Sequence, residues 1–548
     1  MSKPSRLKMI PGVACGLIVG TLAGSVAAQP VLVPGDWLVG SRNFGTVLKV
    51  NPADAELISG RDLSTASMVS RGSGLSLVGV QLDLLAMSEG QLLGRASQTT
   101  NQQGTYSIDV ATGNRTILPG TGVAPWTSGG GGLLRLDQDN VLALVDDFGA
   151  GTAGNGRLVR YTISTGESTL VSGGTRGNGV VIHRPRAMCR FNAHTVAVVE
   201  FGPNAQNALP GALVYLIDLT TGDRTVVSTP GQGAPQRFMC VDGVVSAAPV
   251  AIPGVGWGPV SNGQFRGIAY QNGLIYVSGS LGGTFEPFIM GIIPADGGRT
   301  LVGGTALYPE RVTVPFGAGS TTVIPEAPAS LVVNSDHSLL MCAVFGPNRV
   351  WQLDTNTRQL TIVADMDPAV LAQYRGPASF SSLTVVPVAC TGVPQIVSPT
   401  AAVSACAGAT ASVSVSVGGP GETYFQWRKN GVPINSVFNA SAATATLTIS
   451  TIHDPDTALY DCVVTNWCGS VTSGAAQVFV DPSDMGVQGG QAGRDGVHDN
   501  NDFVVLIDYF FSEDPRADLG RQGGVLGSDG LYNSNDFVVF IDRFFAGC

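Results

Sequence analysis

Charged residues are scarce in this sequence, and lysine is nearly absent. Only 13% of the 548 residues are charged, the net charge is −10, and Lys49 and Lys429 are the only lysines after Lys8. A protein that binds nucleic acid needs a basic stripe to displace counterions from phosphates, and anionic membranes attract clusters of basic residues. We therefore expect no nucleic-acid partner and no electrostatic attachment to a membrane.

Histidine is scarce as well, and the common catalytic motifs are missing. The five histidines include His183, His194 and His337, which never stand at metal-ligand spacing. The chain has no Gly-x-Ser-x-Gly turn, no phosphate-binding P-loop and no Cys-x-x-Cys pair. We assign no catalytic residue and no organic cofactor, and an enzymatic function is the less favoured interpretation.

Long apolar runs are confined to the N-terminus. Lys3, Arg6 and Lys8 precede an apolar stretch, and small residues stand before Gln29. This order is typical of a secretory signal peptide, here residues 1–28. No later run reaches the roughly 18 apolar residues of a transmembrane helix. We expect an exported mature chain without a transmembrane segment, either extracellular or held at the cell surface.

Export permits disulfide bonds, and eight cysteines follow the signal peptide. They are Cys189, Cys240, Cys342, Cys390, Cys406, Cys462, Cys468 and Cys548. The sequence leaves several pairings open: Cys189 with Cys240, Cys390 or Cys406 with Cys468, and Cys406 with Cys548. We prefer Cys390 with Cys468.

Glycine is abundant, with 73 residues, and 44% of the chain is hydrophobic, which favours short strands joined by many turns. A β-hairpin of the form seen in Gly104–Pro119 recurs six times before residue 390. The other copies begin near Val47, Leu158, Leu213, Met290 and Val350. Repeats of this kind indicate an array of equal structural units.

A second strand pair precedes each recurring hairpin, so one unit contains four antiparallel strands, like a blade of a β-propeller. The first hairpin lacks one strand, which Ser382–Pro387 can supply by pairing beside Asp36–Ser41. Such closure removes exposed sheet edges. We predict a six-bladed propeller over residues 30–388, or seven blades if Arg237–Val250 forms one rather than an inserted hairpin.

The segment Val214–Val227 resembles the outer hairpin of bacterial propellers of the NHL and SMP-30/lactonase groups. Enzymes of the lactonase type hold a metal at the channel mouth, so the resemblance suggests an alternative function, an anchored extracellular hydrolase or lyase. Its candidate ligands follow strand ends: Glu89, Asp146, Asp147 and Glu200. The competing interpretation is that these acids belong to solvated turns.

Residues 391–481 carry the signature of an immunoglobulin-like β-sandwich. Trp427 stands on one expected strand, and Asp456-x-Ala458-x-Tyr460-x-Cys462 on another. The cysteine that usually faces Cys462 is missing near Val415, so we expect Cys462 to be a buried apolar residue. We interpret this domain as a spacer.

Residues 484–548 contain a duplicated segment with a constant offset of 34 residues. Each copy matches the second half of an EF-hand calcium loop followed by a short apolar helix. The candidate ligands are Asp495, Asp499 and Asp502 in the first copy, Asp529, Asn533 and Asp536 in the second, and the upstream Asp484 and Asp518. The first-half ligand positions hold Gln, Val or Gly, so the alternative is that these residues only cap helices.

The duplicated segment resembles a dockerin, in the bacterial variant that ends in Gly-Cys, here Gly547-Cys548. The resemblance implies bound calcium and a cohesin-like or cell-envelope docking partner. The sequence therefore predicts a mainly β protein: a propeller, an immunoglobulin-like domain and a small α-helical, dockerin-like EF-hand pair. We expect a secreted, anchored binding protein whose propeller recognises an extracellular ligand.

Overall fold

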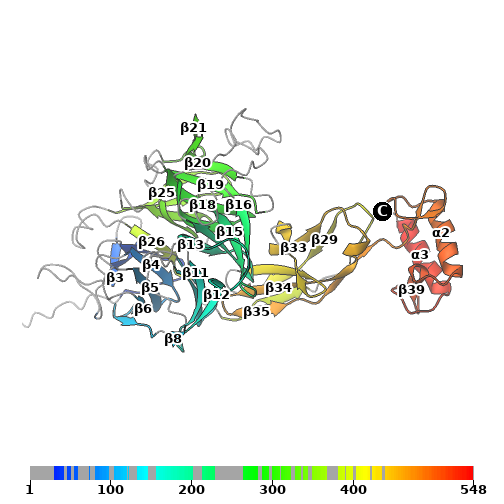
Figure 1. Cartoon of the computed structure of the whole chain (residues 1–548), viewed down its shortest axis with the longest axis horizontal. Coiled ribbons are helices and arrows are strands. Elements are labelled where there is room, and N and C mark those ends of the chain that lie inside the picture. Colours follow the sequence, from blue (N-terminus) through cyan, green and yellow to red (C-terminus); the bar gives the residue numbers. More distant parts are fainter. Residues whose placement is uncertain are drawn as a thin grey trace, which may run out of the picture.

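The computed structural model describes most of the chain from residue 30 onward. The described residues are 30–41, 46–50, 55–59, 73, 81–97, 104–119, 121–122, 132–145, 156–200, 213–228, 263–281, 287–294, 299–308, 310–321, 328–334, 337–343, 348–366, 380–388, 391–398, 403–419, 423–434 and 439–546. Figure 1 draws the others in grey. Arg237–Val250 lies outside the described residues.

The chain is mainly β, with two α-helices among the described residues. Three parts follow one another along the long axis: a region of several sheets, a smaller two-layer region, and a helical pair near the C-terminus (Figure 1). We call them the sheet region (30–388), the sandwich region (391–481) and the C-terminal pair (484–546). No helix in the described part is long and apolar enough to cross a membrane.

The described part of the sheet region contains six sheets of mostly antiparallel strands, numbered I to VI. Sheet I is β26 (Phe380–Val385), β1 (Trp37–Ser41), β2 (Val47–Val50) and β3 (Ala55–Ser59). Sheet II is β4 (Gln81–Ala86), β5 (Gln91–Ser97), β6 (Gly104–Asp109) and β7 (Arg115–Ile117). Sheet III is β9 (Leu133–Arg135), β10 (Asn140–Val145), β11 (Arg157–Thr162) and β12 (Glu167–Gly173), and β8 (Thr121–Gly122) runs parallel to β12.

Sheets IV to VI repeat this order. Sheet IV is β13 (Pro185–Arg190), β14 (Thr195–Glu200), β15 (Val214–Asp218) and β16 (Arg224–Ser228); sheet V is β17 (Gly263–Gln271), β18 (Leu274–Leu281), β19 (Pro287–Ile292), β20 (Arg299–Tyr308) and β21 (Glu310–Val314); sheet VI is β22 (Pro328–Val333), β23 (Leu339–Ala343), β24 (Arg349–Leu353) and β25 (Leu360–Asp365). The six predicted hairpins are confirmed as the third and fourth strands of each sheet, the pairs β2–β3, β6–β7, β11–β12, β15–β16, β19–β20 and β24–β25.

The turn of each hairpin has a local cause. In the fourth copy, Asp218 Oδ1 accepts the backbone N–H groups of Thr220 and Thr221, each at 2.8 Å. Gly222 follows with φ +82°, a left-handed conformation that glycine adopts without strain. The Asp-x-x-Thr-Gly pattern therefore fixes the turn before the second strand begins.

The first strand of each sheet contacts the first strand of the next sheet. The contacts follow the order β4–β9–β13–β17–β22–β26, and β26 in turn contacts β4. A separate apolar core fills the space between each pair of neighbouring sheets. Each sheet thus buries both faces, which explains the unbroken apolar runs in β10 and β14. The predicted pairing of the closing strand is confirmed, since β26 lies antiparallel beside β1 with Trp37 opposite Val385.

The sandwich region contains ten strands in three sheets. They are β27 (Gln395–Ser398), β28 (Val403–Ala405), β29 (Ala411–Ser414), β30 (Ser416–Gly418), β31 (Tyr424–Lys429), β32 (Val432–Pro433), β33 (Thr446–Ile449), β34 (Ala458–Asn466), β35 (Gly469–Thr472) and β36 (Ala476–Val480), with 3-10 helices η2 (Ala440–Ala443) and η3 (Asp454–Asp456). The largest sheet has the order β28-β36-β34-β31-β32, with β35 beside β34; the others are β29–β33 and β27–β30.

One core holds the sandwich region together. Trp427 and Cys462 are fully buried in it and lie opposite each other on β31 and β34. Trp427 Nε1 donates to the Thr444 carbonyl at 2.9 Å, and the Tyr460 hydroxyl donates to the Asp456 carbonyl at 3.0 Å. Cys462 is a free thiol, as the missing partner near Val415 predicts.

The C-terminal pair repeats one motif twice. The first copy is β37 (Gly486–Val487), β38 (Gln491–Ala492) and α2 (Asn500–Phe511); after η4 (Pro515–Ala517) the second is β39 (Gly520–Arg521), β40 (Val525–Leu526) and α3 (Ser534–Ala546). The helices share a small core in which Phe503 meets Phe540 and Phe544, with ring centroids 4.9 and 4.7 Å apart. The two predicted helices are confirmed and extend beyond the apolar runs that indicated them.

Candidate functional site

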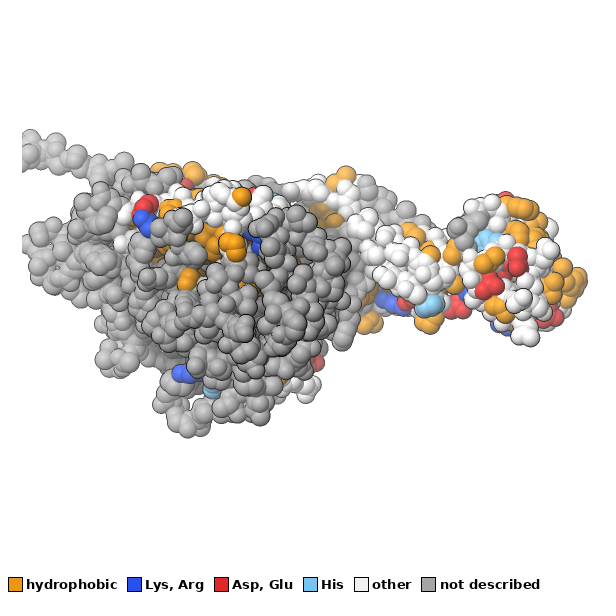
Figure 2. Space-filling view, turned by 90° about the horizontal axis from the view of Figure 1, so that it is seen from above, with side chains coloured by type: hydrophobic (Ala, Val, Ile, Leu, Met, Phe, Trp, Pro, Cys, Tyr) orange, Lys and Arg blue, Asp and Glu red, His pale blue; other side chains and the backbone are white. Residues whose placement is uncertain are grey.

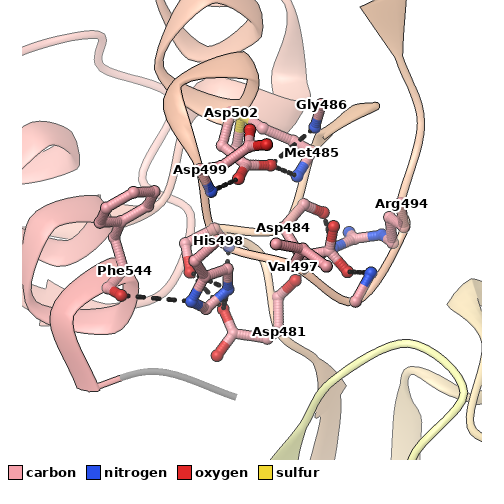
Figure 3. A network of polar contacts seen from close by, with 12 residues as sticks. Asp481, Asp484, Met485, Gly486, Arg494, Val497, His498, Asp499, Asp502 and Phe544 are labelled. Atoms are coloured by element: carbon pink, nitrogen blue, oxygen red, sulfur yellow. Dashed lines mark hydrogen bonds and ion pairs between the residues drawn. The ribbon is translucent and has the colours of Figure 1, made fainter. Parts of the chain in front are cut away.

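Asp502 is the centre of the first repeat in the C-terminal pair. Its carboxylate is fully buried and accepts the N–H groups of Met485 at 2.7 Å, Gly486 at 2.8 Å and Asp499 at 2.8 Å (Figure 3). Asp499 is the N-cap of α2, where its side chain accepts the Asn501 N–H at 2.7 Å. Together they form a capping box that also fastens the upstream β37 to the helix.

Asp484 binds the loop before α2. Its oxygens accept the N–H groups of Asp495 at 3.1 Å and Gly496 at 3.0 Å. Burial raises the pKa of Asp484, and the nearby Asp502 charge adds to this, while the two N–H donors and Arg494 lower it. Asp495 itself accepts the Val497 N–H at 3.0 Å and belongs to the turn.

The second repeat reproduces this network. Asp536, also fully buried, accepts the N–H groups of Leu519 and Gly520 at 2.8 Å and of Asn533 at 2.7 Å. Asp518 accepts the N–H groups of Asp529 and Gly530, at 3.0 and 2.7 Å, and the Ser528 hydroxyl at 2.6 Å. Asn533 Oδ1 accepts the Asn535 N–H at 2.8 Å, the counterpart of the Asp499 cap.

These placements bear on the predicted calcium sites. Calcium takes six to eight oxygen ligands, whereas the described residues contain no group of three His, Cys, Asp or Glu side chains that could hold a metal ion. The buried carboxylates Asp502 and Asp536 turn their oxygens to backbone N–H donors instead. The residues as placed do not fit a calcium cage, and they support the helix-cap alternative. Calcium binding stays a prediction.

The C-terminal pair is fastened to the sandwich region. His498 lies between Ser483, whose hydroxyl is 3.2 Å from Nε2, and the Phe544 carbonyl, 3.2 Å from Nδ1 (Figure 3). Arg494 Nη1 donates to the Asp481 carbonyl, and its Nε pairs with Asp454 at 2.6 Å. The last turn of α3 thus lies close to the end of the sandwich region.

Of the acidic residues suggested for a metal in the sheet region, the two that the structure describes, Glu89 and Glu200, do not come together. Glu89 is exposed in the turn after β4, whereas Glu200 ends β14, opposite Pro185 at the start of β13. Because the first strands of the sheets run side by side, these two positions lie at opposite ends of the region. Glu200 is also not solvated: it is fully buried and accepts the His183 N–H at 2.7 Å. Asp146 and Asp147 lie outside the described residues.

A cavity of 510 Å³ lies where the first strands of the six sheets end. Its wall is mostly apolar, with Arg135, Arg190 and His337 as the charged or titratable basic members. Two aromatic residues of the sandwich region, Tyr424 and Trp467, also line it. No motif in the sequence predicts this site, although Arg135 and Arg190 occupy the same register in two repeats, at the last position of β9 and β13.

The cysteines correct two predicted pairings. Cys189 is not disulfide-bonded, so it does not pair with Cys240. Cys406 and Cys468 are both disulfide-bonded, but not to each other. Cys406 follows β28 at the Ala458 end of β34, and Cys468 follows its other end. Nine extended residues span roughly 30 Å, and a disulfide needs Cα atoms within about 7 Å. Cys390 and Cys548 lie outside the described residues.

Comparison with known proteins identifies one part of the chain. The immunoglobulin I-set domain family matches residues 394–480. Residues 394–480 are an immunoglobulin-like domain of the I-set. This domain accounts for the buried Trp427 and for the Tyr460 hydroxyl bond, which the sequence signature predicted. No curated protein matches the chain.

Several solved structures resemble the immunoglobulin-like domain. They include titin M4 in a trigonal form (23% identity, 16% of this chain and 96% of that chain), a chimeric titin Z1Z2 carrying a KLER peptide from decorin (25%, 17% and 97%) and titin M3 (23%, 16% and 98%), each with a TM-score of 0.15. These likenesses carry no inference beyond the family match.

Proposed function

We propose that the chain is a secreted binding protein in which a six-bladed propeller recognises an extracellular ligand and the C-terminal pair anchors it. The cyclic contacts between the first strands, the pairing of β26 with β1 and the six inter-sheet cores support the propeller. Propellers commonly present binding sites where the inner strands end. The immunoglobulin-like domain is a spacer between recognition and anchoring.

The observation that carries the anchoring role is a duplicated apolar surface. On α2, Val504, Ile507 and Phe511 are 55%, 47% and 79% exposed; their counterparts 34 residues later on α3, Val538, Ile541 and Phe545, are 47%, 41% and 76% exposed. Figure 2 shows apolar side chains gathered on this end of the molecule. Exposed apolar stripes on two packed helices are unfavourable in water unless a partner covers them.

The partner that fits this surface is a protein with an apolar docking face, such as a cohesin-like domain in the cell envelope. Each stripe has the spacing of one helical face, and the aromatic residue at its end can serve as an anchor in a pocket. Asp502 and Asp536 tie each helix to the strand pair before it, so both stripes are carried on the same repeated framework.

The anchoring role can be tested by fractionating the bacterium that produces the protein. We expect the natural chain in the envelope fraction and the double variant Phe511→Ser, Phe545→Ser in the medium, because both stripes lose their aromatic anchor. The matched control is Leu459→Ser, which removes an equally apolar side chain, 50% exposed, from the immunoglobulin-like domain. Retention of a folded double variant in the envelope would contradict the proposal.

A further inference from the structure

The cavity of 510 Å³ is shared between the sheet region and the immunoglobulin-like domain. The last residues of the first strands form its wall, the segment Val386–Val388 borders it, and Tyr424 and Trp467 complete it. Its volume is in the range of roughly 300–1,000 Å³ that holds small molecules, and it is too small for a folded protein partner. The site therefore selects small ligands.

Two arginines connect the wall to the aromatic residues. The Arg135 guanidinium carbon lies 4.1 Å from the Trp467 ring centroid, and that of Arg190 lies 5.1 Å from the Tyr424 ring. Arg135 Nη1 also donates to the Met87 carbonyl at 2.6 Å. Arg190 Nη2 donates to the Leu136 carbonyl at 3.4 Å. A guanidinium that is stacked by its face still presents five N–H groups in its own plane, and anions are the acceptors that these groups bind most strongly.

The charge at this cavity has one sign. Among the described residues that line it, Arg135 and Arg190 are cationic, His337 is the other basic residue, and none is acidic. The remaining wall is dominated by aliphatic side chains, including Leu134, Ile268 and Leu331. A ligand that satisfies both features has an apolar body and one anionic group.

We propose that this inter-domain cavity binds a small amphiphilic carboxylate or sulfonate, its acid group held between Arg135 and Arg190 and its apolar part against the strand ends. This inference deepens the proposed recognition function and rests on it. It gives the immunoglobulin-like domain a second role, since Trp467 and Tyr424 fix the arginines and close one side of the site. A spacer alone has no need of these contacts.

Cys189 provides a reporter inside the cavity. Its thiol is not disulfide-bonded, is partly exposed, and lines the site between Met188 and Arg190. The other free thiols in the described part, Cys342 and Cys462, are fully buried, and burial raises the pKa of each to about 12. A thiol reagent should therefore react with Cys189 before these two, and a bound ligand should protect it.

The test uses the full mature chain and the probe anilinonaphthalene sulfonate, followed by fluorescence, with decanoate as competitor and decanol as its neutral counterpart. We expect decanoate to displace the probe and to slow alkylation of Cys189, and decanol to do so more weakly. Loss of a charge-assisted hydrogen bond costs about 1.5–3 kcal/mol, so Arg135→Gln should weaken decanoate binding roughly 10- to 100-fold. Arg160→Gln, an exposed position on the same sheet, is the matched control.

Three further measurements decide between outcomes. Trp467→Ala should also weaken decanoate binding, which shows that the immunoglobulin-like domain contributes to the site. Cys189→Ser gives the background alkylation, and circular dichroism establishes that each variant is folded. If decanoate and decanol compete equally, or if folded Arg135→Gln binds decanoate like Arg160→Gln, the proposal is wrong.

The two proposals fail separately. Phe511→Ser, Phe545→Ser should keep its decanoate affinity while losing its place in the envelope, because those residues lie in the C-terminal pair. A chain that anchors normally but does not bind decanoate or the probe would overturn the cavity proposal alone. A chain that binds decanoate but does not anchor would overturn the anchoring role alone.

Discussion

Asp484 and Asp518 occupy equivalent positions in the two repeats, but their neighbours differ. Burial acts to raise the pKa of both carboxyls. For Asp518 the hydrogen bonds from the Ser528 hydroxyl and from the N–H groups of Asp529 and Gly530 outweigh burial, and the net pKa lies below 3.8. At Asp484 burial prevails, and the pKa lies above 3.8. The position of Ser528 is taken by Arg494 in the first repeat, which donates to backbone carbonyls.

This difference gives the two carboxylates opposite effects on stability. The stabilisation from Asp518 is present above its unfolded pKa and is lost as the pH falls through the folded value. The contribution of Asp484 has the reverse sign: it is present below the unfolded pKa and is lost as the pH rises through the raised folded value.

Carboxyl-carbon NMR of aspartate-labelled protein measures both pKa values. We predict a midpoint above 3.8 for Asp484 and below 3.8 for Asp518, and Ser528→Ala should raise the Asp518 midpoint by removing its hydroxyl donor. The control is Ser512→Ala, outside both carboxylate networks, which should leave both midpoints in place. Midpoints in the reverse order would contradict the assignment.

For single residues, the sequence predicts the positions of the conspicuous aspartates better than it predicts their structural role. Spacing marks Asp495, Asp499 and Asp502 as a functional set, yet an EF-hand ligand and a capping box both use aspartate near a helix start. The decision depends on where each oxygen points, which requires the loop conformation. For the same reason no pattern in the sequence shows that Glu200 is buried.

The capping role leads to a prediction about metal removal. Because the aspartates are satisfied by backbone N–H groups, excess chelator should leave the unfolding temperature of the C-terminal pair unchanged. Asp499→Ala should lower its stability by about 1 kcal/mol, the usual value of an N-cap. Calorimetry of the full chain, with and without calcium, measures both. A drop in unfolding temperature on chelation would restore the calcium interpretation.

Between elements, the recurring Arg and Ser of the hairpins join one sheet to the next. Arg224 Nη1 donates to the Ser172 hydroxyl at 2.8 Å, and that hydroxyl donates to the Gly222 carbonyl at 2.5 Å. Between sheets I and II, Arg115 Nη1 donates to the Ser59 hydroxyl in the same way, at 2.7 Å. The Arg and Ser positions of the repeat therefore hold a hairpin against the hairpin of the neighbouring sheet.

A double-mutant cycle tests this contact. Ser172→Ala and Arg224→Gln should each destabilise the sheet region by about 1–3 kcal/mol, because each removes a hydrogen bond between a charged guanidinium and a buried hydroxyl. The double variant should cost less than their sum, with a coupling of roughly 0.5–3 kcal/mol. Additive losses in thermal unfolding would show that the two residues act separately. Arg160→Gln, which is exposed, should change little.

The elements themselves follow closely from the sequence. Alternation locates all six hairpins, a Thr-Gly turn marks those that contain Gly113, Gly166 and Gly222, and the unpaired first hairpin indicates the need for β26. The extra strands β8 and β21 were not predicted, since Thr121–Gly122 is too short to show alternation and Glu310–Val314 adds to a sheet already complete by count. Edge strands of this kind depend on the neighbouring surface.

For the whole molecule, a disulfide-bonded cysteine lies at each end of the immunoglobulin-like domain, Cys406 at one end and Cys468 at the other. Asn466 Nδ2 donates to the Gly392 carbonyl at 3.0 Å, which brings the chain near Cys390 close to Cys468. At the other end, the Asp481 N–H donates to the Ala405 carbonyl at 2.7 Å, beside Cys406. The only cysteine near the end of α3 in sequence is Cys548.

We predict that peptide mapping under non-reducing conditions finds Cys468 joined to Cys390 and Cys406 joined to Cys548. The reduced protein supplies the control spectrum. A peptide that joins Cys406 to Cys240, or a Cys548 that carries another group, would disprove the second pairing and leave the first intact. The sequence could not choose among these pairs because connectivity depends on which ends of the domain meet their neighbours.

The pairing of β26 with β1 also constrains how the protein is made. A ribosome delivers β1, β2 and β3 first and Phe380–Val385 only after the other five sheets have been synthesised. Until then β1 has an unpaired edge. Sheet I is therefore the first sheet to be started and the last to be completed. A prematurely terminated chain that stops within sheet VI therefore keeps this edge unpaired and should be prone to aggregation and proteolysis, so the last strand acts as a check that synthesis of the region is finished.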